Sequence, residues 1–244
     1  MTENILDYRG VSDPKEIERL VYRLGNSFLG DLHSNPVIVR NTTILGEDHD
    51  YPRDKEVITL LPQNRYLVLE RMRTEQPEMD AYLEDGDISH LTDVTEVTST
   101  DQEVYETARK NGVRVILADI GEEEMRELFL SSPRLIERAL KGDSDYKDMC
   151  MSLAFKKERD RYIAERIKEK IPNYMDEKTL IKYGALHLVP LISHLFLDNN
   201  YYDRMIEETI FGNALRDWCR NIGFLKEGED FPDIGSTTEK LTVK

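Results

Sequence analysis

Two segments of the chain share one pattern, in which an apolar run is followed by Gly-x-x-His. The first pattern runs from Gly46 to His49 and the second from Gly184 to His187. An apolar run that stops abruptly at glycine and polar residues is typical of the carboxyl end of a buried parallel strand. Two imidazoles and a carboxylate such as Glu47 are suitable ligands for Mn²⁺, Zn²⁺ or Co²⁺, and an open position can hold water. The pattern indicates hydrolytic chemistry at one edge of a sheet.

A further carboxylate and a guanidinium extend this set. Glu70 directly follows the apolar run 66–69, so it lies at the same edge if its strand is a parallel neighbour of the first. Arg159 falls within the apolar stripe of a predicted helix, and a buried guanidinium needs a partner. The candidate partners are Glu70 and Asp119, which follows the apolar run 113–118.

Two mechanisms remain open for these residues. In the first, His49 and His187 bind the metal, Glu47 or Glu70 is a ligand or general base, and Arg159 stabilises an oxyanion. Metal-bound water can have a pKa near about 7, which makes it a nucleophile at neutral pH. In the second, no metal takes part, and His49 is the base that activates water while Glu70 orients it.

Each candidate also has a structural interpretation. Asp48 is expected to cap a helix, a common use of a carboxylate. Glu70 and Arg159 could form a purely structural ion pair. Asp119 precedes Ile-Gly and three glutamates, so capping is as good an interpretation as a site role. Asp160 lies at the border between two faces of its helix and is a candidate either for the site or for a pair along the helix.

The strands and helices expected from the sequence indicate a single α/β domain over residues 1–225. We expect a mainly parallel sheet with helices on both faces and a ligand pocket at the carboxyl ends of its strands. The runs 37–40 and 43–45 predict either one interrupted strand or a tight pair. The stretch 74–100, rich in acidic residues and with Pro77 and Gly86, predicts an acidic loop, either a lid or a solvated insertion. Residues 226–244 predict a polar tail.

The helices follow from apolar periodicity and from capping residues. Ser12 or Asp13 can cap the first one. The predicted helices cover residues 13–24, 102–110, 122–130, 134–140, 145–170, 188–196 and 202–222, with a shorter one around 57–61.

Composition limits the partners. The chain has 244 residues and a formal net charge of -15, which argues against nucleic acid because phosphate binding requires clustered Lys and Arg. Cys150 and Cys219 form no CxxC pair, so we expect free thiols and a reducing cytoplasm. The first residues have no signal-peptide pattern and no apolar run is long enough for a membrane anchor. We expect a cytoplasmic protein with a small-molecule or peptide substrate and no membrane partner.

Four ordered motifs resemble the superfamily of TraB/PrgY, Tiki, ChaN and erythromycin esterase proteins, and TraB/PrgY-like proteins most. They are the two Gly-x-x-His patterns, the strand-end Glu70 and the segment from Glu158 to Ala164, all within residues 40–197. In that superfamily Tiki proteins are metal-dependent peptidases, erythromycin esterases use a histidine base, ChaN proteins bind haem, and TraB/PrgY proteins act on peptide pheromones or sequester them. The resemblance implies a shared pocket instead of one shared reaction.

From the residues and the resemblance we predict a hydrolase, either a metal-dependent peptidase or an amide or ester hydrolase. The predicted catalytic residues are His49, Glu70, Arg159 and His187. A non-enzymatic protein that binds haem or a peptide is the alternative, and a degenerate interaction module of the same superfamily is another.

Overall fold

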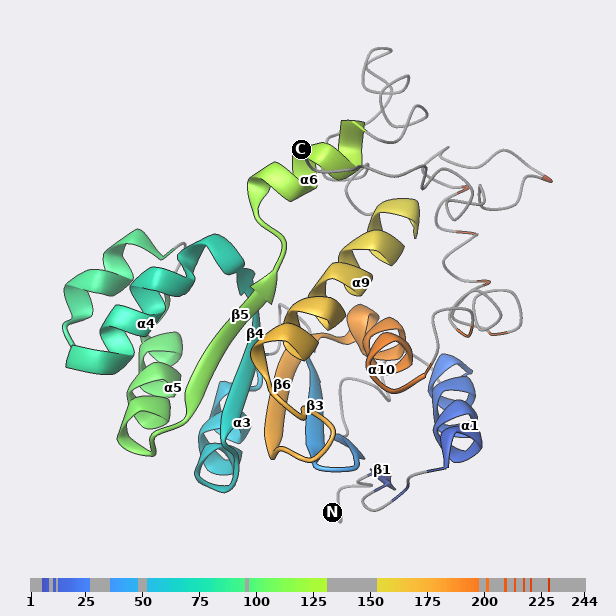
Figure 1. The fold of residues 1–244 in the computed structure, drawn as a ribbon, viewed down its shortest axis with the longest axis horizontal. Helices are drawn as coiled ribbons and strands as arrows, with labels where there is room; N and C mark the ends of the chain where they lie inside the picture. The colour runs from blue at the N-terminus through green and yellow to red at the C-terminus, as the bar shows by residue number, and fades with distance from the viewer. Residues whose placement is uncertain are drawn as a thin grey trace.

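The computed structural model describes residues 6–8, 11, 13–26, 36–47, 52–94, 97–130 and 153–197, together with residues 201, 209, 213, 217, 220 and 228. A six-stranded sheet forms the centre, with strand order β1-β2-β3-β6-β4-β5 (Figure 1). Its neighbours are parallel except for the antiparallel pair β2 and β3. The strands are β1 (Leu6–Tyr8), β2 (Val37–Val39), β3 (Thr42–Glu47), β4 (Tyr66–Met72), β5 (Arg114–Asp119) and β6 (Thr179–Gly184).

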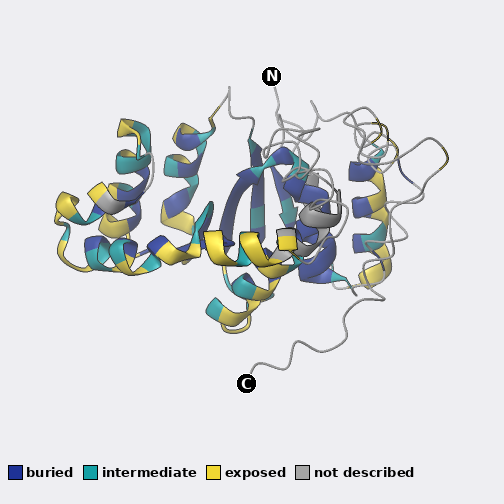
Figure 2. Ribbon diagram, turned by 90° about the horizontal axis from the view of Figure 1, so that it is seen from above, coloured by how far each residue is buried: buried dark blue, intermediate teal, exposed yellow. Residues whose placement is uncertain are grey.

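Helices cover both faces of this sheet, as predicted. On one face lie α3 (Asp54–Leu60), α4 (Gln76–Asp85) and α5 (Ser99–Lys110). The other face is covered by α1 (Pro14–Gly25), α9 (Leu153–Lys170) and α10 (Leu188–Phe196), while α6 (Glu122–Leu130) extends beyond the end of β5. Seen from above, the strands are largely buried and the helices turn exposed faces outward (Figure 2). The chain is therefore α/β with a mainly parallel sheet.

Alternation along each strand divides the core into two clusters. Successive side chains of a strand point to opposite faces. Ile44 and Ile181 accordingly pack with α1, α9 and α10, whereas Leu45 and Leu180 pack with α3, α4 and α5. All four side chains have no exposed surface. Burial on both faces explains the adjacent apolar residues at the centre of these strands, Ile44-Leu45 and Leu180-Ile181.

The order of the strands decides which residues meet at the carboxyl edge. Strand β6, the last in sequence, lies between β3 and β4. The predicted parallel strands that end at Glu47 and Glu70 are therefore not neighbours. The two Gly-x-x-His strands do pair directly, with Glu47 opposite Gly184. Chain order reverses at this point of the sheet, which is where open α/β sheets bind ligands.

The predicted acidic loop over residues 74–100 is wrong. The segment contains α4, a 3₁₀ helix from Ile88 to Asp93 and the start of α5. Pro77 lies in the first turn of α4, and Gly86 ends that helix with the left-handed φ of 78°. Thr98 forms a capping box with Asp101. The residues that suggested a loop are the boundaries of short helices.

Several other predictions have a clear outcome. Asp13 caps α1 by accepting a hydrogen bond from the backbone N–H of Lys15 at 3.0 Å. Strands β2 and β3 are a tight pair joined at Arg40, whose φ is 53°. The predicted helix 134–140, residues 145–152 and all but a few residues of 202–244 lie outside the described residues. Within the described part, no helix has the length and apolar character needed to cross a membrane.

Candidate functional site

The carboxyl ends of β3, β4 and β5, together with β6, border a cavity of about 490 Å³. The predicted strand-end carboxylates Glu47, Glu70 and Asp119 all line it, and Arg159 reaches it from α9. The cavity is thus at the predicted edge of the sheet. Its lining consists of Glu47, Leu69, Glu70, Arg71, Met72, Glu75, Asp101, Asp119, Arg159 and Lys182.

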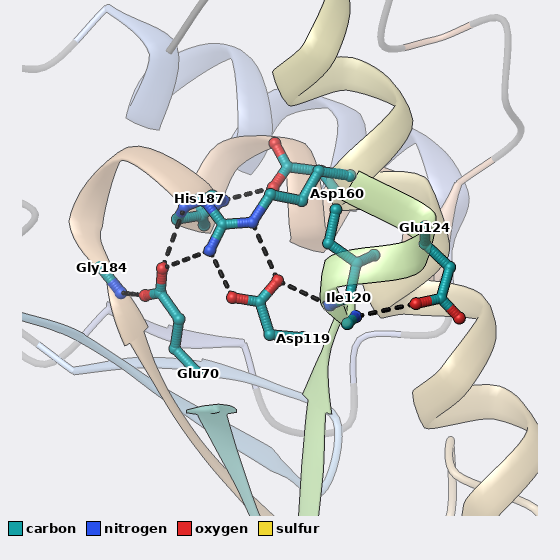
Figure 3. Close-up of polar contacts among 9 residues, drawn as sticks. Glu70, Asp119, Ile120, Glu124, Asp160, Gly184 and His187 are labelled. Atoms are coloured by element: carbon teal, nitrogen blue, oxygen red, sulfur yellow. Dashed lines mark hydrogen bonds and ion pairs between the residues drawn. The ribbon is translucent and has the colours of Figure 1, made fainter. Parts of the chain in front are cut away.

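Glu70 connects three elements at this edge (Figure 3). Its Oε2 accepts a hydrogen bond from the backbone N–H of Gly184 at 2.7 Å. Its Oε1 lies 3.0 Å from Nη2 of Arg159 and 3.3 Å from Nε2 of His187. One carboxylate therefore links the ends of β4 and β6 to α9.

His187 lies between two carboxylates. Its Nδ1 pairs with Oδ1 of Asp160, a residue with no exposed surface, and its Nε2 faces Glu70. The ring of Tyr183 meets the imidazole edge-on at a centroid distance of 5.9 Å. His187 ends a single 3₁₀ turn that starts at Ala185 and leads into α10. Because His187 follows Gly184 by three residues, its imidazole lies just beyond the end of β6 and contacts Asp160 of α9.

Arg159 has the partners that its place in an apolar stripe required. Its Nε donates to Oδ1 of Asp119 at 2.9 Å, and its Nη2 contacts both Asp119 and Glu70. Asp119 is held by a further hydrogen bond from the backbone N–H of Ile120 at 2.8 Å. The two contacts with Asp119 hold the planar guanidinium in one orientation, which the single ammonium of a lysine could not do.

These contacts set the charge states of His187 and Glu70. Burial lowers the pKa of His187, but the charge and hydrogen bond of Asp160, with those of Glu70, raise that pKa to about 9. The imidazole is therefore protonated at neutral pH. Burial raises the pKa of Glu70, yet the hydrogen bond and charge of His187 and the charge of Arg159 hold it well below its usual range. Glu70 remains ionised.

A second ion-pair group contributes Glu47 and Lys182 to the lining of the cavity. Nζ of Lys182 lies 2.6 Å from Oδ1 of Asp54 and 2.9 Å from Oε2 of Glu47. Burial lowers the pKa of Lys182, and these two carboxylates more than compensate, so the ammonium stays charged. Farther along the wall, Arg71 pairs with Asp101 at 3.0 Å.

The structure brings three of the four predicted catalytic residues together. Glu70, Arg159 and His187 share direct contacts, whereas His49 and the predicted cap Asp48 lie outside the described residues. Asp160, which had two candidate roles, joins the site through His187. The roles of these residues in catalysis stay predictions.

Sequence reasoning missed Lys182, Asp54 and Arg71. Lys182 did carry a signal, because a lysine within the apolar run of residues 180–183 requires carboxylate partners when that run is buried. Asp54 ends the polar run 50–54, which the sequence indicated to be a loop, whereas the structure places it in the first turn of α3. Arg71 follows Glu70 in a strand that was expected to have ended there, so it carried no signal.

The predicted metal ligands have other partners in this arrangement. Glu47 faces the ammonium of Lys182, and both ring nitrogens of His187 face carboxylates. Among the residues that the structure describes, no three His, Cys, Asp or Glu side chains are grouped as a metal site requires. As placed, Glu47 and His187 fit an ion-pair network and do not fit an open metal or haem site. The predicted metal and haem stay predictions that also depend on His49.

Gly184 is needed for close approach. Its φ of -52° suits any residue, but a Cβ at this position would lie 3.1 Å from Oε2 of Glu70 and 3.5 Å from Cδ2 of His187. The glycine of the second pattern therefore makes room for the carboxylate. No protein-family model, curated protein or solved structure matches this chain.

Proposed function

We propose that the chain is a hydrolase whose active site is the cavity at the carboxyl edge of the sheet. The observation that carries the proposal is the series Asp160, His187 and Glu70, which joins a buried imidazole to two carboxylates, of which Glu70 lines that cavity. The resemblance to the superfamily of TraB/PrgY, Tiki, ChaN and erythromycin esterase proteins supports the same class of reaction.

His187 acts in this proposal as a general acid. Since its pKa is about 9, it holds a proton at neutral pH. Its Nε2 faces the lining residue Glu70, so it can give this proton to a leaving group that takes the place of Glu70 at Nε2. Asp160 orients the ring and stabilises its charge, as the carboxylate of a catalytic triad does. Glu70 is a weak base because its pKa is low, so it positions His187 and Arg159. His49, two residues beyond the lining residue Glu47, is the proposed group that activates water.

A binding protein without chemistry is the second candidate, and one observation favours it. Glu70, Asp119, Arg159, Asp160 and His187 pair among themselves, so each charge already has a partner of opposite sign. Such a network can hold a pocket in shape without turning over a substrate.

Turnover of a panel of generic ester, amide and short peptide substrates tests the first candidate. We expect His187→Gln and Asp160→Asn to lower kcat by about 10² or more with unchanged circular dichroism. His90→Gln is the matched control, because His90 also pairs with a carboxylate, Asp85 at 2.9 Å, but lies in the 3₁₀ helix from Ile88 to Asp93 and pairs with none of the lining carboxylates. Turnover that His187→Gln leaves intact would contradict the proposal, and a wild-type chain that turns over nothing would favour the binding protein.

A further inference from the structure

The lining of the cavity has a surplus of negative charge. Among the described residues of the lining, five carboxylates face three cations, which leaves a formal difference of two negative charges. Each cation already has a carboxylate partner: Arg159 has Glu70 and Asp119, Lys182 has Glu47 and Asp54, and Arg71 has Asp101. The two ion-pair groups add three described charges outside the lining, the carboxylates Asp54 and Asp160 and the cation His187, and these do not reverse the balance.

This balance discriminates between classes of ligand. An anionic ligand would have to displace a carboxylate from Arg159, Lys182 or Arg71, and would leave that carboxylate without its cation in a half-buried site. A cationic ligand finds carboxylate oxygens that accept additional hydrogen bonds, since each ionised carboxylate has about four lone-pair positions. The formal net charge of -15 on the whole chain also draws cations toward the cavity.

The form of the lining favours an organic cation over a metal ion. A metal site gathers its ligands around one point at about 2 Å. The lining carboxylates are instead distributed over β3, β4, β5, α5 and the turn at Glu75, and no three of the described acidic or histidine side chains form such a group. A volume of about 490 Å³ is in the range of small-molecule pockets.

We propose that the cavity binds a small organic cation bearing one or two ammonium groups, held by the lining carboxylates Glu47 and Glu75, which do not contact Arg159. The inference rests on the proposed function in that this cation is the substrate, or part of it. Binding itself, however, does not require turnover.

Calorimetric titration of the full chain with three four-carbon probes tests the charge preference. The probes are 1,4-diaminobutane, butane-1,4-diol and succinate, which are similar in size. At neutral pH the diamine is positively charged, the diol is neutral and succinate is negatively charged. We expect diaminobutane to bind at least about ten-fold more tightly than the diol, succinate to give no binding, and added NaCl to weaken the diamine. Succinate that binds as tightly as the diamine, or diamine binding that salt leaves unchanged, would overturn the proposal.

Two charge-removing variants and one matched control locate the site. Glu47→Gln and Glu75→Gln should each weaken diaminobutane by about ten-fold. Glu84→Gln makes the same change at an exposed position of α4 outside the lining and should leave binding unchanged. Diamine binding that neither lining variant alters would overturn the assignment. So would MnCl₂ binding at the cavity in place of the diamine.

The two proposals fail in different ways. Loss of the diamine preference with His187-dependent turnover intact would reject only the substrate class. Diamine binding that depends on Glu47 and Glu75, with no turnover of any substrate, would reject only the hydrolase.

Discussion

At the scale of residues, the site is a set of buried and partly buried charges that pair with one another. Arg159 and His187 are the cations, and Glu70, Asp119 and Asp160 are the anions. Buried charges of this kind contribute little net stability as a set, but removal of one leaves its partners uncompensated. The pairing explains how the chain keeps an imidazolium at neutral pH in a largely buried position.

The first prediction concerns the titration of His187. Its pKa is raised from the ordinary 6.5 to about 9, so the stabilisation is fully present below pH 6.5 and is lost as the pH rises through about 9. The upper bound is about 3 kcal/mol. Urea unfolding between pH 6 and pH 10 measures this loss. In His187→Gln this fall in unfolding free energy should disappear. An equal pH dependence of unfolding in the wild-type and variant proteins would contradict the raised pKa.

At the scale of elements, the end of β6 places the site. Gly184 closes the strand and leaves room for Glu70, and the single turn from Ala185 to His187 then starts α10. Adjacent residues of α9, Arg159 and Asp160, contact the two sides of the network. The site therefore depends on the position of α9 relative to the ends of β4, β5 and β6.

The second prediction is that Gly184→Ala disturbs the site through Glu70. The added Cβ would lie 3.1 Å from Oε2 of Glu70, so the carboxylate must move away from this Cβ by a few tenths of an ångström, which disturbs its contact with His187. We expect a loss of about 1–3 kcal/mol in unfolding free energy. We also expect a lower His187 pKa by NMR, because Glu70 helps to raise it.

Gly112→Ala is the control for this variant. Gly112 has a left-handed φ of 64° and no atoms within 4 Å of an added Cβ, so the cost there comes from the backbone alone. It should lower stability by about 1 kcal/mol and leave the His187 titration unchanged. An unchanged His187 titration in Gly184→Ala would refute the close-approach argument.

At the scale of the whole molecule, charge is the dominant property. The formal net charge of -15 means that the folded chain repels itself, and the acidic cavity lining belongs to the same field. The ion pairs around Arg159 and Lys182 offset part of this repulsion locally.

The third prediction follows from that net charge. Raising NaCl from 10 to 150 mM at pH 7 should raise Tm by about 2–5 °C, because salt screens the repulsion. Scanning calorimetry measures the shift. Near the pI of about 4.9 the same addition of salt should have little effect, and a fall in Tm with salt at pH 7 would contradict the argument.

Much of the local structure could be predicted because its signals are local. Helix α10 matches the predicted range 188–196, and strand-end carboxylates at Glu47, Glu70 and Asp119 do reach one edge. The need of Arg159 for carboxylate partners also followed from its place in an apolar stripe. Capping residues between 74 and 100 were misread because the short helices there have weak apolar periodicity.

The sequence by itself determined which residues would be buried, charged or placed at strand ends, because alternation along strands and helical periodicity are properties of neighbouring residues. Only the tertiary structure decided that β6 lies between β3 and β4, and hence that His187 meets Asp160 and Glu70 while Lys182 meets Glu47 and Asp54. Strand order depends on packing between segments more than a hundred residues apart, which no local pattern records.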